Sequence, residues 1–159
     1  MIVLNDKYLN SPLGSQLNCI NLQCKNKNEK IAGFLKSLTY KEKSLFLDYN
    51  NCQSPPDKES LKSSFIDLTG YECALNSVYL SDFTEKGIPI DVDLLNQYCS
   101  EVEHIKESFA VPRKLVFIIK IIDEEPMDMR VTFHLFRENE NYLESNIDTY
   151  NEPIAIIIE

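Results

Sequence analysis

The side chains of this sequence that could do chemistry are few, and they include only two histidines. Glu101 and His104 have the Glu-x-x-His spacing, which places a carboxylate and an imidazole on one helix face, as in carboxylate-bridged di-metal sites. Such a site needs a second copy of the motif and further glutamates on other helices, whereas the sequence has one copy. We therefore expect a solvated helix face here, and we predict neither a metal nor another cofactor.

Cysteine catalysis would need a thiolate beside a base. Cys99 falls beside the apolar stripe of a predicted helix, where a thiol is inert, and His134 is expected at the surface or at a sheet edge. The five cysteines form no Cys-x-x-Cys pair, and no signal-peptide pattern opens the chain. They are expected to be free thiols in a reducing compartment, which implies a cytoplasmic location.

Phosphate-binding and nucleophile motifs are missing as well. The sequence contains no Gly-x-Gly-x-x-Gly, no P-loop and no Gly-x-Ser-x-Gly. The lysines of residues 25–43 offer a weak RNA-binding surface, but the remainder of the chain would repel a phosphate backbone. No apolar run approaches the roughly 20 residues that span a bilayer. We therefore expect neither nucleic acid nor membrane as a partner.

Acidic residues dominate the last two thirds of the chain. Residues 1–50 hold seven lysines and four acids, whereas residues 51–159 hold 21 acids and nine bases. Such a field speeds encounter with basic partners, although solvated turns and solubility explain many acidic surfaces equally well. The candidate partner-binding acids lie in the turns of the final third: Asp123, Glu124, Glu125, Asp128, Glu138, Glu140, Glu144 and Asp148.

The elements that carry these turns are three predicted strands. Residues 114–122 are apolar on both faces except at Lys120, which is typical of a central strand. Residues 129–135 alternate, so Phe133 should be buried while Arg130 and Thr132 are more exposed. A hairpin loop at 123–128 joins these two strands, and residues 153–158 form the last strand.

The first two thirds predict mostly helices. We expect strands at 1–9 and 17–24, then a helical pattern over 26–49 that begins with an Asn26–Glu29 capping box and divides near 40–43. A helix over 55–69 should begin at Ser54 and end at Gly70, residues 71–83 fit a strand or irregular structure, and a longer helix should follow Asp91. Together the elements predict one α+β domain over 1–159, with an antiparallel sheet built largely from the C-terminal strands and packed against helices from the middle.

The final third resembles the small immunity proteins of bacterial toxin–immunity systems, including those of contact-dependent growth inhibition. The resemblance rests on a strand at residues 131–137, an acidic turn, Tyr142-Leu143, and a closing strand at residues 150–159. It implies tight binding of one cognate toxin domain, often a basic nuclease, and it carries over no catalytic residue.

The leading hypothesis is therefore an immunity-type inhibitor that occludes the active site of a basic toxin domain and is not itself an enzyme. Two alternatives stay open at this stage. One is an acidic protein-binding adaptor unrelated to toxins, and the other is an enzyme of unrecognised type.

Overall fold

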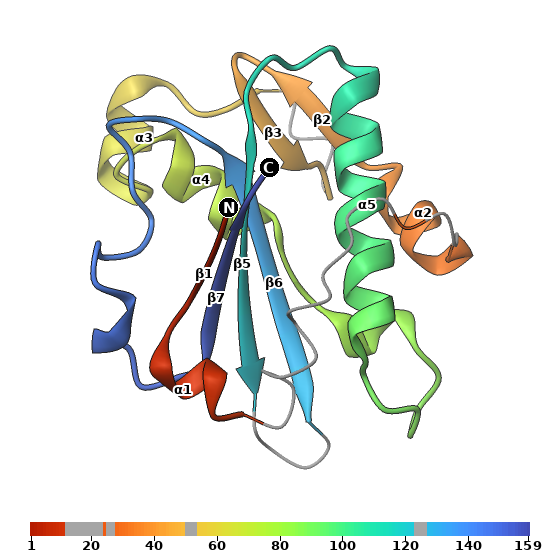
Figure 1. Cartoon of the computed structure of the whole chain (residues 1–159). Coiled ribbons are helices and arrows are strands. Elements are labelled where there is room, and N and C mark those ends of the chain that lie inside the picture. Colours follow the sequence, from red (N-terminus) through yellow and green to blue (C-terminus); the bar gives the residue numbers. More distant parts are fainter. Residues whose placement is uncertain (12–23, 25–27, 50–53, 123–126) are drawn as a thin grey trace.

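The computed structural model describes residues 1–11, 24, 28–49, 54–122 and 127–159. Its main feature is a five-stranded antiparallel sheet with the spatial order β1-β7-β5-β6-β4 (Figure 1). The strands are Ile2–Leu4 (β1), Ser77–Tyr79 (β4), Leu115–Ile122 (β5), Asp128–Leu135 (β6) and Ile154–Ile158 (β7). The predicted α+β class is confirmed, and β5 is the central strand that its apolar sequence indicated.

The first face of the sheet holds the main core. Along β6 every second side chain, from Met129 to Leu135, is fully buried, as the alternation predicted. This face packs against α5 (Val92–Ser108), which runs beside the shorter α2 (Glu29–Leu35) (Figure 1). Among the described residues, no helix has both the length and the apolar character needed to cross a membrane.

The second face is also covered, which agrees with the apolar side chains on both faces of β5. The long connection between β6 and β7 passes on the side of the sheet opposite α5 (Figure 1). It contains the short 3-10 helix η3 (Ile147–Thr149). On this face Arg130 is partly exposed as predicted, whereas Thr132 is buried, contrary to prediction. Thr132 pairs with Ser77 of edge strand β4, with 2.9 Å between their hydroxyl oxygens.

Helix α5 begins and ends close to its predicted limits. The carboxylate of Asp91 accepts a hydrogen bond from the backbone N–H of Leu94 at 2.9 Å, which is the N-cap geometry that its position suggested. Tyr98 and Val102 of this helix are fully buried. Phe109 is 40% exposed, because α5 ends at Ser108 and Phe109 follows as the C-cap.

The helix predicted over 55–69 is two helices, α3 (Lys58–Ser64) and α4 (Leu68–Leu75). Asp57, rather than Ser54, caps α3 by accepting two backbone N–H groups. Ile66 then adopts a left-handed φ of 73°, which ends the first helical segment. Asp67 caps α4 through the N–H of Gly70, so Gly70 lies inside the second helix and does not terminate the first.

The prediction of helix in the second half of residues 26–49 is also wrong. After α2, the chain forms a hairpin of β2 (Leu38–Lys41) and β3 (Ser44–Leu47). Both turn residues, Glu42 and Lys43, have positive φ, which is the geometry of a two-residue hairpin. Short apolar runs do not distinguish a buried helix from a buried strand, and β3 is buried on both faces.

The remaining segments are shorter than predicted or lie outside the described residues. β1 covers three residues and gives way to α1 (Asp6–Leu9), which Asn5 caps by accepting the N–H of Tyr8. Residues 71–83 divide among α4, β4 and the 3-10 helix η2 (Leu80–Phe83). The predicted strand over 17–24 and the Asn26 cap lie outside the described residues except for Cys24, and Asn28 is the N-cap of α2.

Candidate functional site

The residues first considered for catalysis occupy separate places. His104 is exposed on α5, as predicted for a solvated helix face, and the part of the chain that the structure describes brings no three His, Cys, Asp or Glu side chains together as metal ligands. Cys99 is fully buried in the same helix, and burial raises the pKa of its thiol far above the ordinary value. A thiol in this position stays protonated and is a packing residue.

The predicted acidic patch is divided between distant parts of the fold. Asp123, Glu124 and Glu125 lie outside the described residues. Asp128 begins β6, whereas Glu138 and Glu140 follow the other end of that strand, so these acids lie at opposite ends of the sheet.

Several of the acids have structural roles that charge counting did not reveal. Asp128 accepts hydrogen bonds from the N–H and hydroxyl of Ser81, at 3.1 and 2.5 Å, and so ties η2 to β6. Asp148 accepts the backbone N–H of Asp6 at 2.9 Å and supports α1. Glu138 and Glu144 are exposed; the carboxylate of Glu144 accepts a long hydrogen bond of 3.4 Å from the hydroxyl of Thr149, and its backbone N–H donates to the hydroxyl of Tyr150 at 3.1 Å.

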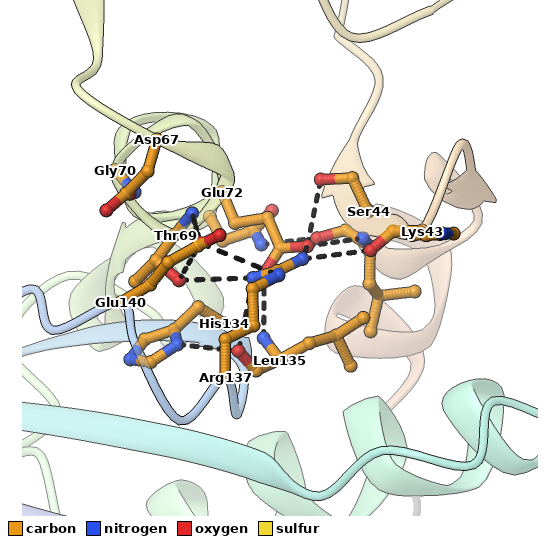
Figure 2. A network of polar contacts seen from close by, with 12 residues as sticks. Lys43, Ser44, Asp67, Thr69, Gly70, Glu72, His134, Leu135, Arg137 and Glu140 are labelled. Carbon is orange, nitrogen blue, oxygen red and sulfur yellow. Dashed lines mark hydrogen bonds and ion pairs between the residues drawn. The ribbon is translucent and has the colours of Figure 1, made fainter. Parts of the chain in front are cut away.

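A buried ion pair that sequence reasoning missed fixes the start of the β6–β7 connection (Figure 2). Glu72 of α4 and Arg137, two residues after β6, form two hydrogen bonds: Oε1 to Nη2 at 2.6 Å and Oε2 to Nη1 at 3.0 Å. The exposed fractions of their side chains are 0% and 6%. The only sequence signal was a single acid in the otherwise apolar segment of residues 71–75.

The remaining bonds of Glu72 connect three elements. Its carboxylate accepts the hydroxyl of Ser44 at 2.8 Å, the N–H of Leu45 at 2.9 Å and the N–H of Leu135 at 2.7 Å. With Arg137, five hydrogen bonds saturate its two oxygens and join α4, β3 and β6. A carboxylate so fully engaged is positioned for structure, not for proton transfer.

The outer side of Arg137 extends this network toward the surface. Glu140 lies 3.6 Å from Nε of Arg137, and it accepts the N–H and the hydroxyl of Thr69 at 3.0 and 2.9 Å. Burial by itself lowers the pKa of Arg137, but hydrogen bonding and attraction to Glu72 outweigh it and leave the pKa raised. Arg137 is therefore charged at every physiological pH, and the connection is held firmly against α4.

Beyond this network, the connection and the second face of the sheet enclose a half-open groove of about 250 Å³. Its floor is apolar, with Val116 and Ile118 of β5 beside Ile156 and Ile158 of β7. Its lining residues also include the partly exposed Phe136 and Tyr142 and two acids, Glu140 and Glu144. The groove thus combines an apolar bottom with an acidic margin.

His134 also lines this groove, and it is 5% exposed, which corrects its predicted place at the surface or a sheet edge. It is buried because it lies opposite Val116 of β5, on the face that the β6–β7 connection covers. Nδ1 of His134 lies 3.0 Å from the carbonyl oxygen of Leu135, which can only accept, so Nδ1 carries the proton and Nε2 carries a lone pair. Burial lowers the pKa of His134, so the ring is neutral at pH 7.

Comparison with known proteins identifies a family for this chain. A family model described as the uncharacterized protein PM0498 family matches residues 8–159. No curated protein and no solved structure matches the chain. The family description states no activity, so function is argued from the geometry above.

Proposed function

We propose that this chain, which belongs to the uncharacterized PM0498 family, is an immunity-type inhibitor that binds a basic toxin domain through its β6–β7 connection. The observation that carries the proposal is the position of Glu138 and Glu144. Both are exposed acids on a segment that the buried Arg137–Glu72 pair holds in place.

Charge supports a basic partner. The connection carries one basic side chain, Arg137, which is committed to Glu72. Its acids are Glu138, Glu140, Glu144, Asp148 and Glu152. A surface of one sign accelerates association with a partner of the other sign and disfavours partners of like charge.

Rigidity and aromatic content support tight binding. A segment that is already ordered loses less conformational entropy when it binds than a flexible loop does. Phe136 and Tyr142, 40% and 45% exposed, stand on the same connection as the acids. Exposed aromatic rings within a polar margin are typical of the anchors that contribute most of the energy of a protein interface.

The mechanism we propose is occlusion. The carboxylates of the connection would pair with lysine and arginine side chains that otherwise hold the toxin's substrate, and the aromatic rings would exclude water from the contact. This mechanism needs no chemistry from the inhibitor itself. The acids Asp123, Glu124, Glu125 and Asp128 belong to the proposal on sequence grounds, as a second acidic run of the chain.

The test is association kinetics with a partner recovered by co-purification from the native host. Replacing Glu138 and Glu144 together by lysine should lower the association rate constant about tenfold at low salt, because long-range attraction accelerates encounter. The control reverses Glu85, which follows η2, and Glu107 of α5, exposed acids outside the connection, which gives the same change in net charge. A third variant reverses Asp123, Glu124 and Glu125.

Added salt should slow association of the unmodified protein far more than it speeds dissociation, since screening acts over about 8–10 Å. Electrostatic steering would be refuted by an association rate constant that changes neither with salt, nor in the Glu138 and Glu144 variant, nor in the variant at residues 123–125. A partner that binds but has no toxic activity when expressed alone would leave protein binding in place and refute the immunity role.

A further inference from the structure

The groove on the second face of the sheet is lined in part by His134, which has a ring nitrogen that could accept a hydrogen bond but has no donor in the part of the chain that the structure describes. Nδ1 of His134 is engaged by the carbonyl of Leu135, whereas Nε2 has no hydrogen-bond partner among the described residues. In Figure 2 the free nitrogen points away from Glu72 and Arg137. Nε2 of His134 is not among the fully buried atoms that lack a partner, so it is open to a donor that enters the groove, either water or a group of a ligand.

The space around His134 limits what could donate. Its floor is formed by branched aliphatic side chains of β5 and β7, including Ile118 and Ile156, which favour an apolar group. The volume of about 250 Å³ exceeds that of the roughly 150 Å³ cavity that holds benzene, so a bicyclic aromatic ring with one polar atom fits. An ammonium group would need three acceptors, whereas the ring N–H of an indole needs one.

The charge beside the groove indicates where such a ring comes from. Glu140 and Glu144 line the groove, and Glu138 is exposed on the same connection. The groove is half open rather than enclosed, so a ring can enter while still attached to a larger molecule. A tryptophan flanked by lysine or arginine matches both the apolar floor and the acidic margin.

We propose that this groove receives a tryptophan side chain of a basic protein partner, whose indole N–H donates a hydrogen bond to Nε2 of His134. This inference rests on the proposed function and deepens it, because it names the anchor residue that the partner contributes. Tryptophan is also among the residues most enriched at energetically dominant interface positions.

Indole fluorescence provides the test, because the chain itself contains no tryptophan. The probe is a blocked peptide, Lys-Lys-Trp-Lys-Lys, whose emission should shift to shorter wavelength and saturate as the protein is added. A matched peptide has phenylalanine in place of tryptophan, and its affinity is measured by its ability to displace the tryptophan peptide. It should bind about fivefold more weakly, because phenylalanine lacks the donor. N-acetyltryptophanamide, which lacks the lysines, should also bind more weakly.

Variants of the protein separate the ring contact from general binding. His134→Leu should abolish the preference for tryptophan over phenylalanine, and His134→Gln, which restores an acceptor, should recover part of it. Ser145→Phe adds a ring at an exposed position that lines the groove, so both peptides should lose binding while the core is untouched. With the co-purified partner, Ser145→Phe should raise the dissociation rate constant.

Equal affinity for the two peptides, or a tryptophan preference that survives His134→Leu, would overturn the assignment of the acceptor. Affinity for N-acetyltryptophanamide equal to that for the lysine peptide would indicate a small-molecule site and overturn the protein source. If Ser145→Phe leaves dissociation of the partner unchanged while the Glu138 and Glu144 reversal slows its association, the proposed function stands and the tryptophan anchor falls.

Discussion

Glu72 and Arg137, separated by 65 residues in sequence, form a two-point hydrogen-bonded ion pair inside the protein, at the junction of α4, β3 and β6. Removing one partner leaves the other charge buried and uncompensated. This costs more free energy than the intact pair contributes to stability. Arg137→Ala should therefore lower the free energy of unfolding by about 3–5 kcal/mol. Urea denaturation measures the loss, with the exposed Arg113→Ala as control. A loss below about 1 kcal/mol would contradict the role given to the pair.

Replacement by alanine should change the stability of the protein in opposite directions at two glycines that lie inside helices. A Cβ on Gly70 of α4 would lie 2.0 Å from the backbone oxygen of Phe65, so Gly70→Ala should destabilise by about 3 kcal/mol or more. A Cβ on Gly33 of α2 would meet nothing within 4 Å, so Gly33→Ala should stabilise by about 0.5–1 kcal/mol. Thermal melts of both variants test the pair, and a Gly70→Ala variant that melts no lower than the unmodified protein would refute the close approach at Gly70.

Phe133 and Phe136 lie three residues apart but differ in burial. Phe133 is fully buried, with its ring centroid 6.1 Å from that of Phe117, whereas Phe136 is 40% exposed. Phe133→Ala should cost about 3–5 kcal/mol in denaturant unfolding, because it leaves a cavity in the main core. Phe136→Ala should cost less than about 1 kcal/mol. Similar losses at both sites would indicate that the register of β6 differs from the one described.

Stability should depend on the protonation of His134. Burial lowers its pKa below the ordinary 6.5 and outweighs the attraction of Glu72 and Asp67, which favours protonation, while Arg137 opposes protonation. Between pH 6.5 and the lower folded value, the unfolded chain binds a proton that the folded protein does not, so stability falls as pH falls through this window.

This dependence can be isolated by difference. The urea midpoint should fall between about pH 7.5 and about pH 5.5, and this drop should be larger for the unmodified protein than for His134→Gln. His104→Gln, at an exposed position of α5, is the matched control and should leave the drop unchanged. An identical pH dependence in the His134 and His104 variants would show that burial does not perturb His134.

Ile66 carries backbone strain in an exposed place. Its φ of 73° lies in the left-handed region, which is unfavourable for a β-branched residue, and its side chain is 83% exposed. Ile66→Gly should stabilise the protein by about 0.5–1 kcal/mol, because relief of strain exceeds the entropy that glycine adds to the unfolded chain. Ile88→Gly, at an exposed position without positive φ, should destabilise instead, and calorimetry compares the two.

The C-terminal strands could be predicted because their periodicity is local and strong. The alternation from Met129 to Leu135 fixes which side chains enter the core, and the apolar run of β5 fits the central strand. The cap at Asp91 likewise depends only on the residues that follow it.

The errors arose where distant contacts outweigh local pattern. The apolar residues of β3 fit a helix equally well in sequence, and the hairpin forms because the fold buries both of its faces. The division into α3 and α4 depends on left-handed backbone at Ile66, for which a β-branched residue gives no signal.

For the candidate site, the sequence by itself determined the acidic character of the C-terminal turns, because charge follows from composition alone. Only the tertiary structure decided which acids are engaged within the protein, since Glu140 and Asp148 accept hydrogen bonds from Thr69 and Asp6, more than 70 residues away. It also placed His134 in a groove, because that position depends on the β6–β7 connection crossing the sheet. Pairing between segments far apart along the chain is a property of three-dimensional packing, and local sequence patterns do not encode it.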